Sequence, residues 1–215
     1  MVRLIEHGLL PPAAGHRGAL WWRCDPPRPA LSSASVGGGL RTVAWVLNTG
    51  VVHDYARTDL AAHAAEVGAP LGLRGPGTAL FTAVPVTRVR EGEEQGAHAW
   101  STVGVTRPTW PAQRGAVVGE RLPGTINTVV TLPVRLGPDA LVQAALAATE
   151  AKAQACVEAG LPGTGTASDA LVVLAAPEQD ADAPLEPFGG VRSTWGSRVA
   201  LAVHAAVTAG LAVRP

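Results

Sequence analysis

Lysine is nearly absent from this sequence. Lys152 is the only lysine among 215 residues, and arginine supplies every other basic side chain apart from histidine. Basic and acidic residues are equal in number, which leaves a formal net charge of zero. Because clustered positive charge is what binds a nucleic-acid backbone or an anionic bilayer, we expect neither nucleic acid nor a membrane surface as a partner.

Cysteine and long apolar runs are also scarce. Cys24 and Cys156 belong to no Cys-x-x-Cys pair and no Cys/His cluster, so the sequence predicts neither a disulfide framework nor a zinc site. No segment approaches the ~20 consecutive apolar residues of a membrane-spanning helix. Glu6 and His7 also interrupt the N-terminal stretch where a signal peptide would be apolar. We therefore expect an unexported, cytoplasmic protein.

The motifs of common nucleotide-binding and hydrolytic sites are missing. No glycine-rich stretch is followed by Lys-Ser or Lys-Thr, and no Gly-x-Gly-x-x-Gly follows a strand, so nucleotide binding is not indicated. The chain also lacks Gly-x-Ser-x-Gly and His-Glu-x-x-His. Its six histidines are dispersed, and only His53, beside Asp54, suggests a site. We expect no metal centre and no resident cofactor.

What the sequence does contain is enough apolar surface for a large core. Apolar residues make up 47% of the chain, and we expect a single domain over residues 1–215 with its core at about 31–213. Periodicity and turn residues predict the elements. The predicted strands are residues 41–52, 78–90, 97–105, 125–134 and 168–176, and the predicted helices are residues 58–67, 138–159 and a last helix capped by Ser193.

This order of elements predicts an α+β or α/β fold. We expect a mixed sheet of about five strands, or two stacked sheets, with helices packed outside. The acidic residues 91–96 are expected to form the solvated tip of a hairpin. Residues 106–124 read as a long loop with Trp110 in its middle, and loops of that length are often functional.

Two similar segments, Val-Leu-Asn48-Thr49 and Thr-Ile-Asn127-Thr128, each place an asparagine inside a predicted strand. Strand propensity disfavours asparagine there. If the match reflects an internal repeat, the two halves would pack about a pseudo-twofold axis and both asparagines would face one shared site. The alternative is coincidence, because β-branched runs resemble one another.

The helix predicted at 138–159 carries the only lysine. At 100° per residue, Lys152 shares a face with Thr149 and Cys156, whereas Ala147 points the opposite way, so we expect the lysine side chain on the buried face. A buried ammonium group needs a partner or loses its proton. Glu150, on the flank of the helix, or Asp169, at the start of an apolar strand, could be that partner. The alternative is a lysine on a solvated face.

Several segments, taken in order, resemble the adenosylcobinamide amidohydrolase family. They are Leu31–Leu40, Val46–Thr49 followed by Asp54-Tyr55, Pro123–Asn127, Ala148–Lys152 and the Gly-Thr-Gly-Thr run that leads to Asp169. The resemblance implies hydrolysis of the amide that joins the aminopropanol arm to the corrin ring of adenosylcobinamide. The product would be adenosylcobyric acid, for cobalamin salvage, and the cobalt would belong to the corrinoid substrate.

The chain departs from the family pattern at two places. Ala167 and Ser168 separate the last threonine of the Gly-Thr-Gly-Thr run from Asp169, although in the family the aspartate usually follows directly. Near the last helix, Arg192 stands where the family pattern suggests a histidine. These departures favour, as an alternative, a corrinoid- or tetrapyrrole-binding protein without catalysis.

Amide hydrolysis requires a nucleophile, a donor to the oxyanion and an acid for the leaving amine. Lys152 would stabilise the oxyanion or protonate the amine, and Glu150 or Asp169 would act as the base. If the route is covalent, Ser33 and Thr125 are the candidate nucleophiles.

Further residues are candidates for substrate binding. Asn48 and Asn127, with backbone N–H groups near Gly38 and Gly124, would hold the carbonyl group, unless the asparagines only satisfy buried backbone groups. Thr149 lies one helical turn from Lys152, and Trp110 could cover a bound corrin.

Two other functions fit the same residues. The chain could hydrolyse a different amide with the same lysine-centred site, or its apolar helices could serve oligomerisation in a domain without a cleft. A homo-oligomer is compatible with any of these functions.

Overall fold

The computed structural model describes residues 5–13, 16–113, 115 and 124–213. Its elements follow in this order: β1 (Glu6–Leu10), β2 (Ala19–Ser32), β3 (Gly39–Gly50), α1 (Leu60–Gly68), η1 (Ala69–Leu71), β4 (Gly77–Thr82), η2 (Val86–Arg88), β5 (Arg90–Glu94), β6 (Ala97–Gly104), β7 (Thr125–Thr131), β8 (Arg135–Leu136), α2 (Pro138–Glu158), β9 (Ala170–Leu174), β10 (Leu185–Glu186) and α3 (Thr194–Leu211).

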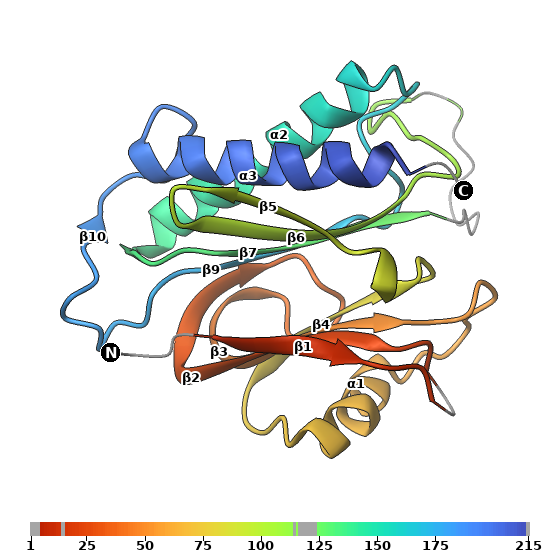
Figure 1. Cartoon of the computed structure of the whole chain (residues 1–215), viewed down its shortest axis with the longest axis horizontal. Coiled ribbons are helices and arrows are strands. Elements are labelled where there is room, and N and C mark those ends of the chain that lie inside the picture. Colours follow the sequence, from red (N-terminus) through yellow and green to blue (C-terminus); the bar gives the residue numbers. More distant parts are fainter. Residues whose placement is uncertain (1–4, 14–15, 114, 116–123, 214–215) are drawn as a thin grey trace.

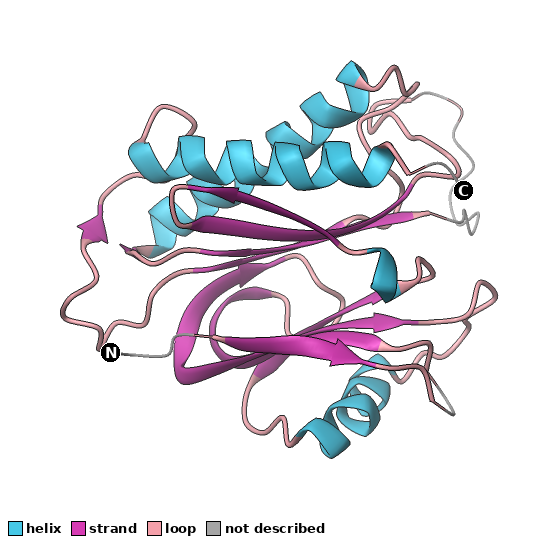
Figure 2. Cartoon of the chain, viewed as in Figure 1, coloured by secondary structure: helices cyan, strands magenta, loops and turns pink. Residues whose placement is uncertain are grey.

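In the described residues, eight strands form one mixed sheet in the order β4-β3-β2-β9-β7-β6-β5, with β1 paired to β2. β3 and β4 run parallel, as do β7 and β9, and the other neighbours are antiparallel. Figure 1 shows that the sheet folds over into two layers. The layer of β5, β6, β7 and β9 lies under α2 and α3, and the layer of β1, β3 and β4 lies against α1 (Figure 2).

The long strand β2 joins the layers, because it pairs with β3 over most of its length, with β1 at its start and with β9 at its end. Three apolar clusters fill the spaces on either side of the layers. One, with Val130 and Val203, packs under α2 and α3; a second, with Trp22 and Val129, lies between the layers; and a third, with Leu47, lies under α1. The prediction of a mixed sheet with helices packed outside is confirmed.

α2 begins and ends, and α3 begins, where the sequence indicates. Pro138 occupies the first turn of α2, and Gly160, two residues past its last residue, has a φ of 73° that suits a glycine stop. Ser193 caps α3, since its Oγ accepts a hydrogen bond of 3.0 Å from the Gly196 N–H. α3 buries Trp195, as predicted.

Strands β1 and β2 were missed by the sequence analysis. The Pro-Pro pair at 26–27 hides β2, because proline cannot donate to a strand ladder and usually marks an edge or a bulge. The structure places a register shift there, between Arg23 and Arg28, so that β2 pairs with β3 on both sides of the prolines.

The predicted acidic hairpin tip is wrong. Residues Arg90–Glu94 form strand β5, and only Gln95 and Gly96, which have positive φ, make the turn to β6. β5 is an edge strand, and an edge strand tolerates charged side chains because one of its sides faces solvent. The predicted strand 78–90 is β4 followed by the short helix η2.

The first helix starts later than predicted, at Leu60. Asp59 precedes it but makes no side-chain cap, since its carboxylate binds Arg57 instead. The structure does not confirm the internal repeat either.

Among the described residues, none of the helices combines the length and the apolar character needed to cross a bilayer.

The contact between β5 and α3 depends on Gly92. A Cβ atom there would collide with the carbonyl oxygen of Ala202 and lie 2.9 Å from the backbone nitrogen of Ala206. Since backbone atoms cannot rotate away, we expect Gly92→Ala to lower the free energy of unfolding by roughly 1–3 kcal/mol. Glu91→Ala, at an exposed position of the same strand, should change it by less than about 0.5 kcal/mol. Urea denaturation measures both variants, and equal effects would contradict this packing.

Candidate active site

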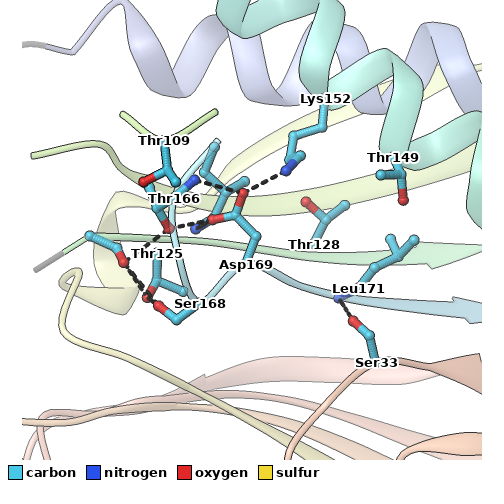
Figure 3. Close-up of polar contacts among 12 residues, drawn as sticks. Ser33, Thr109, Thr125, Thr128, Thr149, Lys152, Thr166, Ser168, Asp169 and Leu171 are labelled. Carbon is cyan, nitrogen blue, oxygen red and sulfur yellow. Dashed lines mark hydrogen bonds and ion pairs between the residues drawn. The ribbon is translucent and has the colours of Figure 1, made fainter. Parts of the chain in front are cut away.

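An ion pair between α2 and the start of β9 lies at the centre of the candidate site. Lys152 Nζ donates to Asp169 Oδ2 at 2.6 Å, and the two side chains are 18% and 12% exposed (Figure 3). Of the two acids proposed as partners, Asp169 is therefore the one that binds the lysine. Glu150 is exposed on α2.

Asp169 accepts three further hydrogen bonds. Thr166 donates to it twice, from its backbone N–H at 3.0 Å and from Oγ1 at 2.5 Å, and the Ile126 N–H donates at 2.9 Å. An ionised carboxylate offers about four acceptor positions, so this one is fully engaged. The carboxylate is thereby fixed to the loop before β9 and to β7, and it holds the lysine ammonium in one place.

The loop before β9 is fitted closely around this pair. A Cβ atom at Gly165 would collide with both Lys152 Nζ and Asp169 Oδ2, so only glycine leaves room for the pair. The extra residues Ala167 and Ser168 do not break the contact of Thr166 with Asp169. Instead, Ser168 Oγ lies 2.7 Å from Thr125 Oγ1, which ties the loop to β7.

The ion pair lines a cavity of about 270 Å³. The other lining residues are Ser33, Ile126, Thr128, Ala148, Thr149, Ala170, Leu171 and Val203. Ser33 Oγ accepts the Leu171 N–H at 2.9 Å, so the serine's own proton remains available to a ligand. Thr128 Oγ1 lies 2.9 Å from Ser101 Oγ, and Thr149 Oγ1 donates to its own helix at Ala145 O.

A second, apolar hollow of about 250 Å³ adjoins this cavity. The two share Ser33, Thr149 and Leu171, and the hollow extends along α2 to Val142 and Leu146. Leu146 is 59% exposed and Val142 44% exposed, although both are aliphatic. The polar cavity thus opens beside a surface that could contact a broad apolar ligand.

The helix α2 is rotated relative to the face expected from the sequence. Its buried residues include Ala144, Ala147, Ala151 and Ala155, and Ala147, expected to point outward, is 2% exposed. Lys152 lies at the edge of this stripe. The error arises because alanine occurs on every side of α2, so its apolar residues do not mark the packed face.

Four of the predicted site residues meet in one place: Ser33, Thr149, Lys152 and Asp169. Thr125 lies close by but lines a different cavity of about 560 Å³, together with His53 and Arg88. Arg192, in the other departure from the family pattern, is exposed.

Asn48 and Asn127 come together, as expected of them, but away from Lys152. Asn127 Nδ2 donates to Asn48 Oδ1 at 2.9 Å and to Phe81 O at 3.0 Å, and Asn48 Nδ2 donates to Thr102 Oγ1 at 3.1 Å. Successive side chains of a strand point to opposite faces. Thr128, next to Asn127 in β7, lines the Lys152 cavity, so Asn127 lies on the other side of the strand.

Gly38 and Trp110 lie outside both the cavity and the apolar hollow. Gly38 is exposed in the turn between β2 and β3. Trp110 is 45% exposed, and its neighbour Thr109 is bound to the loop before β9, through the Thr109 N–H to Gly165 O at 2.9 Å and the Thr164 N–H to Thr109 O at 3.1 Å. The rest of the predicted loop, at 114 and 116–123, lies outside the described residues.

Neither cysteine suits a nucleophilic role. Burial raises the pKa of the Cys156 thiol, against a smaller lowering by the nearby Lys152 charge. Burial also raises the pKa of Cys24 to about 11. Both thiols are therefore protonated at neutral pH, and a protonated thiol is a poor nucleophile.

Two residues of the site were missed in the sequence. Thr166 belongs to the Gly-Thr-Gly-Thr run that carries the resemblance, and that run could have identified it as the partner of Asp169. Thr128 directly follows Asn127, and strand alternation places it on the lysine side of β7. No sequence signal indicated which side that was.

Comparisons with known proteins identify the same family that the sequence segments resemble. The family model for adenosylcobinamide amidohydrolase matches residues 12–214. The chain belongs to this family. A curated adenosylcobinamide amidohydrolase from Methanosarcina mazei is 26% identical over 188 residues, which cover 85% of this chain and 90% of the relative. The resemblance stated from the sequence is confirmed, and so is the expectation of an amidohydrolase that acts on a non-peptide amide.

Solved structures support the fold alone. The crystal structure of the PH0078 protein from Pyrococcus horikoshii OT3 aligns with a TM-score of 0.52 at 11% identity, covering 97% of this chain and 84% of that one. The l-aminopeptidase d-ala-esterase/amidase from Ochrobactrum anthropi aligns with a TM-score of 0.43 at 14% identity, covering 96% and 82%. The second similarity is too low to support a conclusion.

The geometry of the ion pair predicts a large effect of Asp169→Asn on stability. The amide keeps one oxygen in place of two, so it cannot accept all four donors, and it leaves the Lys152 ammonium half-buried without a counter-charge. We expect the free energy of unfolding to fall by about 3 kcal/mol. Glu150→Gln, two residues from the lysine and exposed, is the control. A loss below about 1 kcal/mol for Asp169→Asn, measured by urea denaturation, would show that the pair does not hold this loop.

Proposed function

We propose that the protein hydrolyses the amide bond between the aminopropanol arm and the corrin ring of adenosylcobinamide. Water adds across the bond, giving adenosylcobyric acid and free aminopropanol, and the acid re-enters cobalamin synthesis as a salvaged precursor. The observation that carries this proposal is the Lys152–Asp169 pair in a hydroxyl-lined cavity, inside a chain of this family.

Lys152 provides the positive charge for the reaction in this proposal. Its ammonium has three protons, and the hydrogen bond to Asp169 engages one of them, so the others can donate into the cavity. An amide oxygen bound there gains negative charge as the carbonyl carbon becomes tetrahedral, and a fixed positive group lowers the energy of that state more than that of the substrate.

Asp169 acts in this proposal as a positioning residue. All of its acceptor positions are engaged by Lys152, Thr166 and Ile126, so it has no free lone pair with which to take a proton from water. Glu150, exposed on α2 and outside the cavity, has no position from which to act as the base.

Ser33 is the hydroxyl that we assign to the scissile amide. The Leu171 N–H donates to its Oγ, and Ser33 lines the same cavity as Lys152. In the covalent route, Ser33 Oγ attacks the carbonyl carbon, the C–N bond breaks as the hydroxyl proton passes to the amine of aminopropanol, and water then hydrolyses the ester to the acid. In the direct route, Ser33 holds the water that attacks, and a proton of that water passes to the leaving amine. A transient mass increase of the protein during turnover distinguishes the covalent route from direct attack by water.

The apolar hollow along α2 offers a place for the corrin ring. A macrocycle is too broad for a cavity of about 270 Å³, so only the aminopropanol arm would enter, and the ring would rest on Val142 and Leu146. Trp110, next to the loop that holds Asp169, would contact the ring from another side.

We also propose that no resident metal or cofactor takes part and that the reaction is cytoplasmic. The charge that a metal would bring to the carbonyl oxygen is supplied by Lys152. Among the described residues, no group of three or more His, Cys, Asp or Glu side chains could hold a metal ion, and Cys24 and Cys156 are free thiols. Turnover should therefore persist in EDTA.

Substitution of Lys152 tests the chemical role directly. Lys152→Met should lower kcat roughly 100- to 1,000-fold, the usual cost of losing one oxyanion donor, with adenosylcobinamide still bound. Lys152→Arg should also lower it sharply, because the planar guanidinium cannot occupy the place of the ammonium. Formation of adenosylcobyric acid by mass spectrometry is the readout, with Glu150→Gln as the control.

The outcomes of that experiment separate the alternatives. A wild-type protein that binds adenosylcobinamide without releasing adenosylcobyric acid would be a corrinoid-binding protein, and one that hydrolyses only another amide would have a different substrate. If Lys152→Met kept wild-type rates and Arg88→Ala lost turnover, hydrolysis would instead take place in the cavity of about 560 Å³ that Arg88 lines.

Two exposed leucines test where the corrin ring binds. Leu146→Glu places a charge in the apolar hollow and should raise KM for adenosylcobinamide about tenfold or more, with kcat changed less. Leu201→Glu is the matched control, because Leu201 is 54% exposed on α3 and lines neither the cavity nor the hollow. Steady-state kinetics give both constants, and equal values of KM would contradict this binding surface.

A further inference from the structure

A buried arginine outside the Lys152 site forms no ion pair with the described residues. Arg28 lies in β2 and is 2% exposed. Its Nη1 donates to the carbonyl oxygens of Leu132 and Ala175, both at 3.2 Å, and these are its only hydrogen bonds in the described part of the chain. Its Nε is buried and has no partner there. No carboxylate of the described residues pairs with it, although Asp180 is near enough to act on it through space.

Arg28 faces a cavity of about 520 Å³ between the two layers of the sheet. The other lining residues are Ile5, His7, Glu91, Gly96, His98, Trp100, Thr131, Leu132 and Pro133. His7 comes from β1 in one layer, and His98, Trp100 and Thr131 come from β6 and the end of β7 in the other. The cavity shares no lining residue with the Lys152 cavity or with its apolar hollow.

Aromatic rings form one wall of this cavity. Trp100 stacks with His98, with ring centroids 5.8 Å apart and planes 19° apart, and His7 contacts the same indole at 5.1 Å. Trp100 Nε1 is buried without a hydrogen-bond acceptor in the described residues. Among the described residues, the Arg28 Nε and the Trp100 indole N–H are therefore two buried donors of the cavity lining that lack an acceptor. The only carboxylate among its lining residues is that of Glu91, which is exposed to solvent.

We propose that this cavity is a second ligand site, which binds a small organic anion through the guanidinium of Arg28. A guanidinium removed from water is stabilised by an anion, and its planar set of N–H donors matches the oxygens of a carboxylate or a phosphate. Burial also lowers the pKa of Arg28, which is the sign of an ion that has lost its hydration.

The volume of the Arg28 cavity and its aromatic wall indicate which kind of anion would fit. A cavity of this size falls in the range of sites for small organic molecules and exceeds what an inorganic ion fills. The His7, Trp100 and His98 rings give an apolar organic group a flat surface to lie against. The ligand is thus a carboxylate or a phosphate monoester that carries a flat apolar group, and it differs in charge from the amide substrate of the Lys152 site.

Calorimetric titration of the whole protein with benzoate and with phenyl phosphate tests the proposal. The buffer contains chloride as the only small anion, and sodium chloride at equal ionic strength is the blank. Wild type should bind at least one of the two saturably, and the stronger binder identifies carboxylate or phosphate as the preferred group. Arg28→Met should bind at least tenfold more weakly, whereas Arg41→Met, at an exposed arginine of β3, should bind as wild type does.

Two further variants keep the test decisive if Arg28→Met does not fold. Glu91→Gln removes the exposed carboxylate from the cavity lining and should tighten binding, and Lys152→Met, in the other cavity, should leave it unchanged. The proposal is overturned if wild type binds neither probe beyond the chloride blank. It is equally overturned if binding disappears in Lys152→Met, which would assign the anion to the other site.

Discussion

The candidate site depends on the hydrogen bond between Lys152 and Asp169. This bond connects the middle of α2 to the loop before β9, and the same carboxylate is bound to β7 through the Ile126 N–H. Thr166 closes the loop around it, and Gly165 leaves the space that the two charged groups occupy. Removing either charge would leave the other half-buried, so the shape of the cavity and its positive charge depend on one contact.

Polar residues on the two faces of strand β7 have different roles, because each face looks toward a different part of the molecule. β7 presents Ile126 and Thr128 toward α2 and the lysine, and Asn127 toward the interior, where it binds Asn48 across the space between the layers. A motif such as Pro-Gly-Thr-Ile-Asn thus serves both the cavity and the joining of the layers. The buried Arg28 lines a second cavity, to which both layers contribute residues.

The sequence predicted the elements with a strong periodicity or a clear cap, and it failed where local preference and position in the sheet disagree. Ser193 and Gly160 marked helix ends that the structure confirms. β2 was missed because prolines interrupt a central strand at a bulge, and β5 because acidic residues are tolerated at an edge. The sequence predicts Ser33, Thr149, Lys152 and Asp169 as site residues, and the structure places all four on one cavity. The face of α2 could not be read from a helix so rich in alanine.

The single lysine makes one spectroscopic measurement unusually direct. Protein labelled with ¹⁵N-lysine contains one labelled ammonium group, that of Lys152, so its Nζ resonance reports on the cavity without assignment. The account predicts that this resonance shifts on addition of adenosylcobinamide, and that Asp169→Asn changes its position in the free protein. An Nζ resonance that stays unchanged while the protein hydrolyses adenosylcobinamide would contradict the central claim that Lys152 meets the scissile amide.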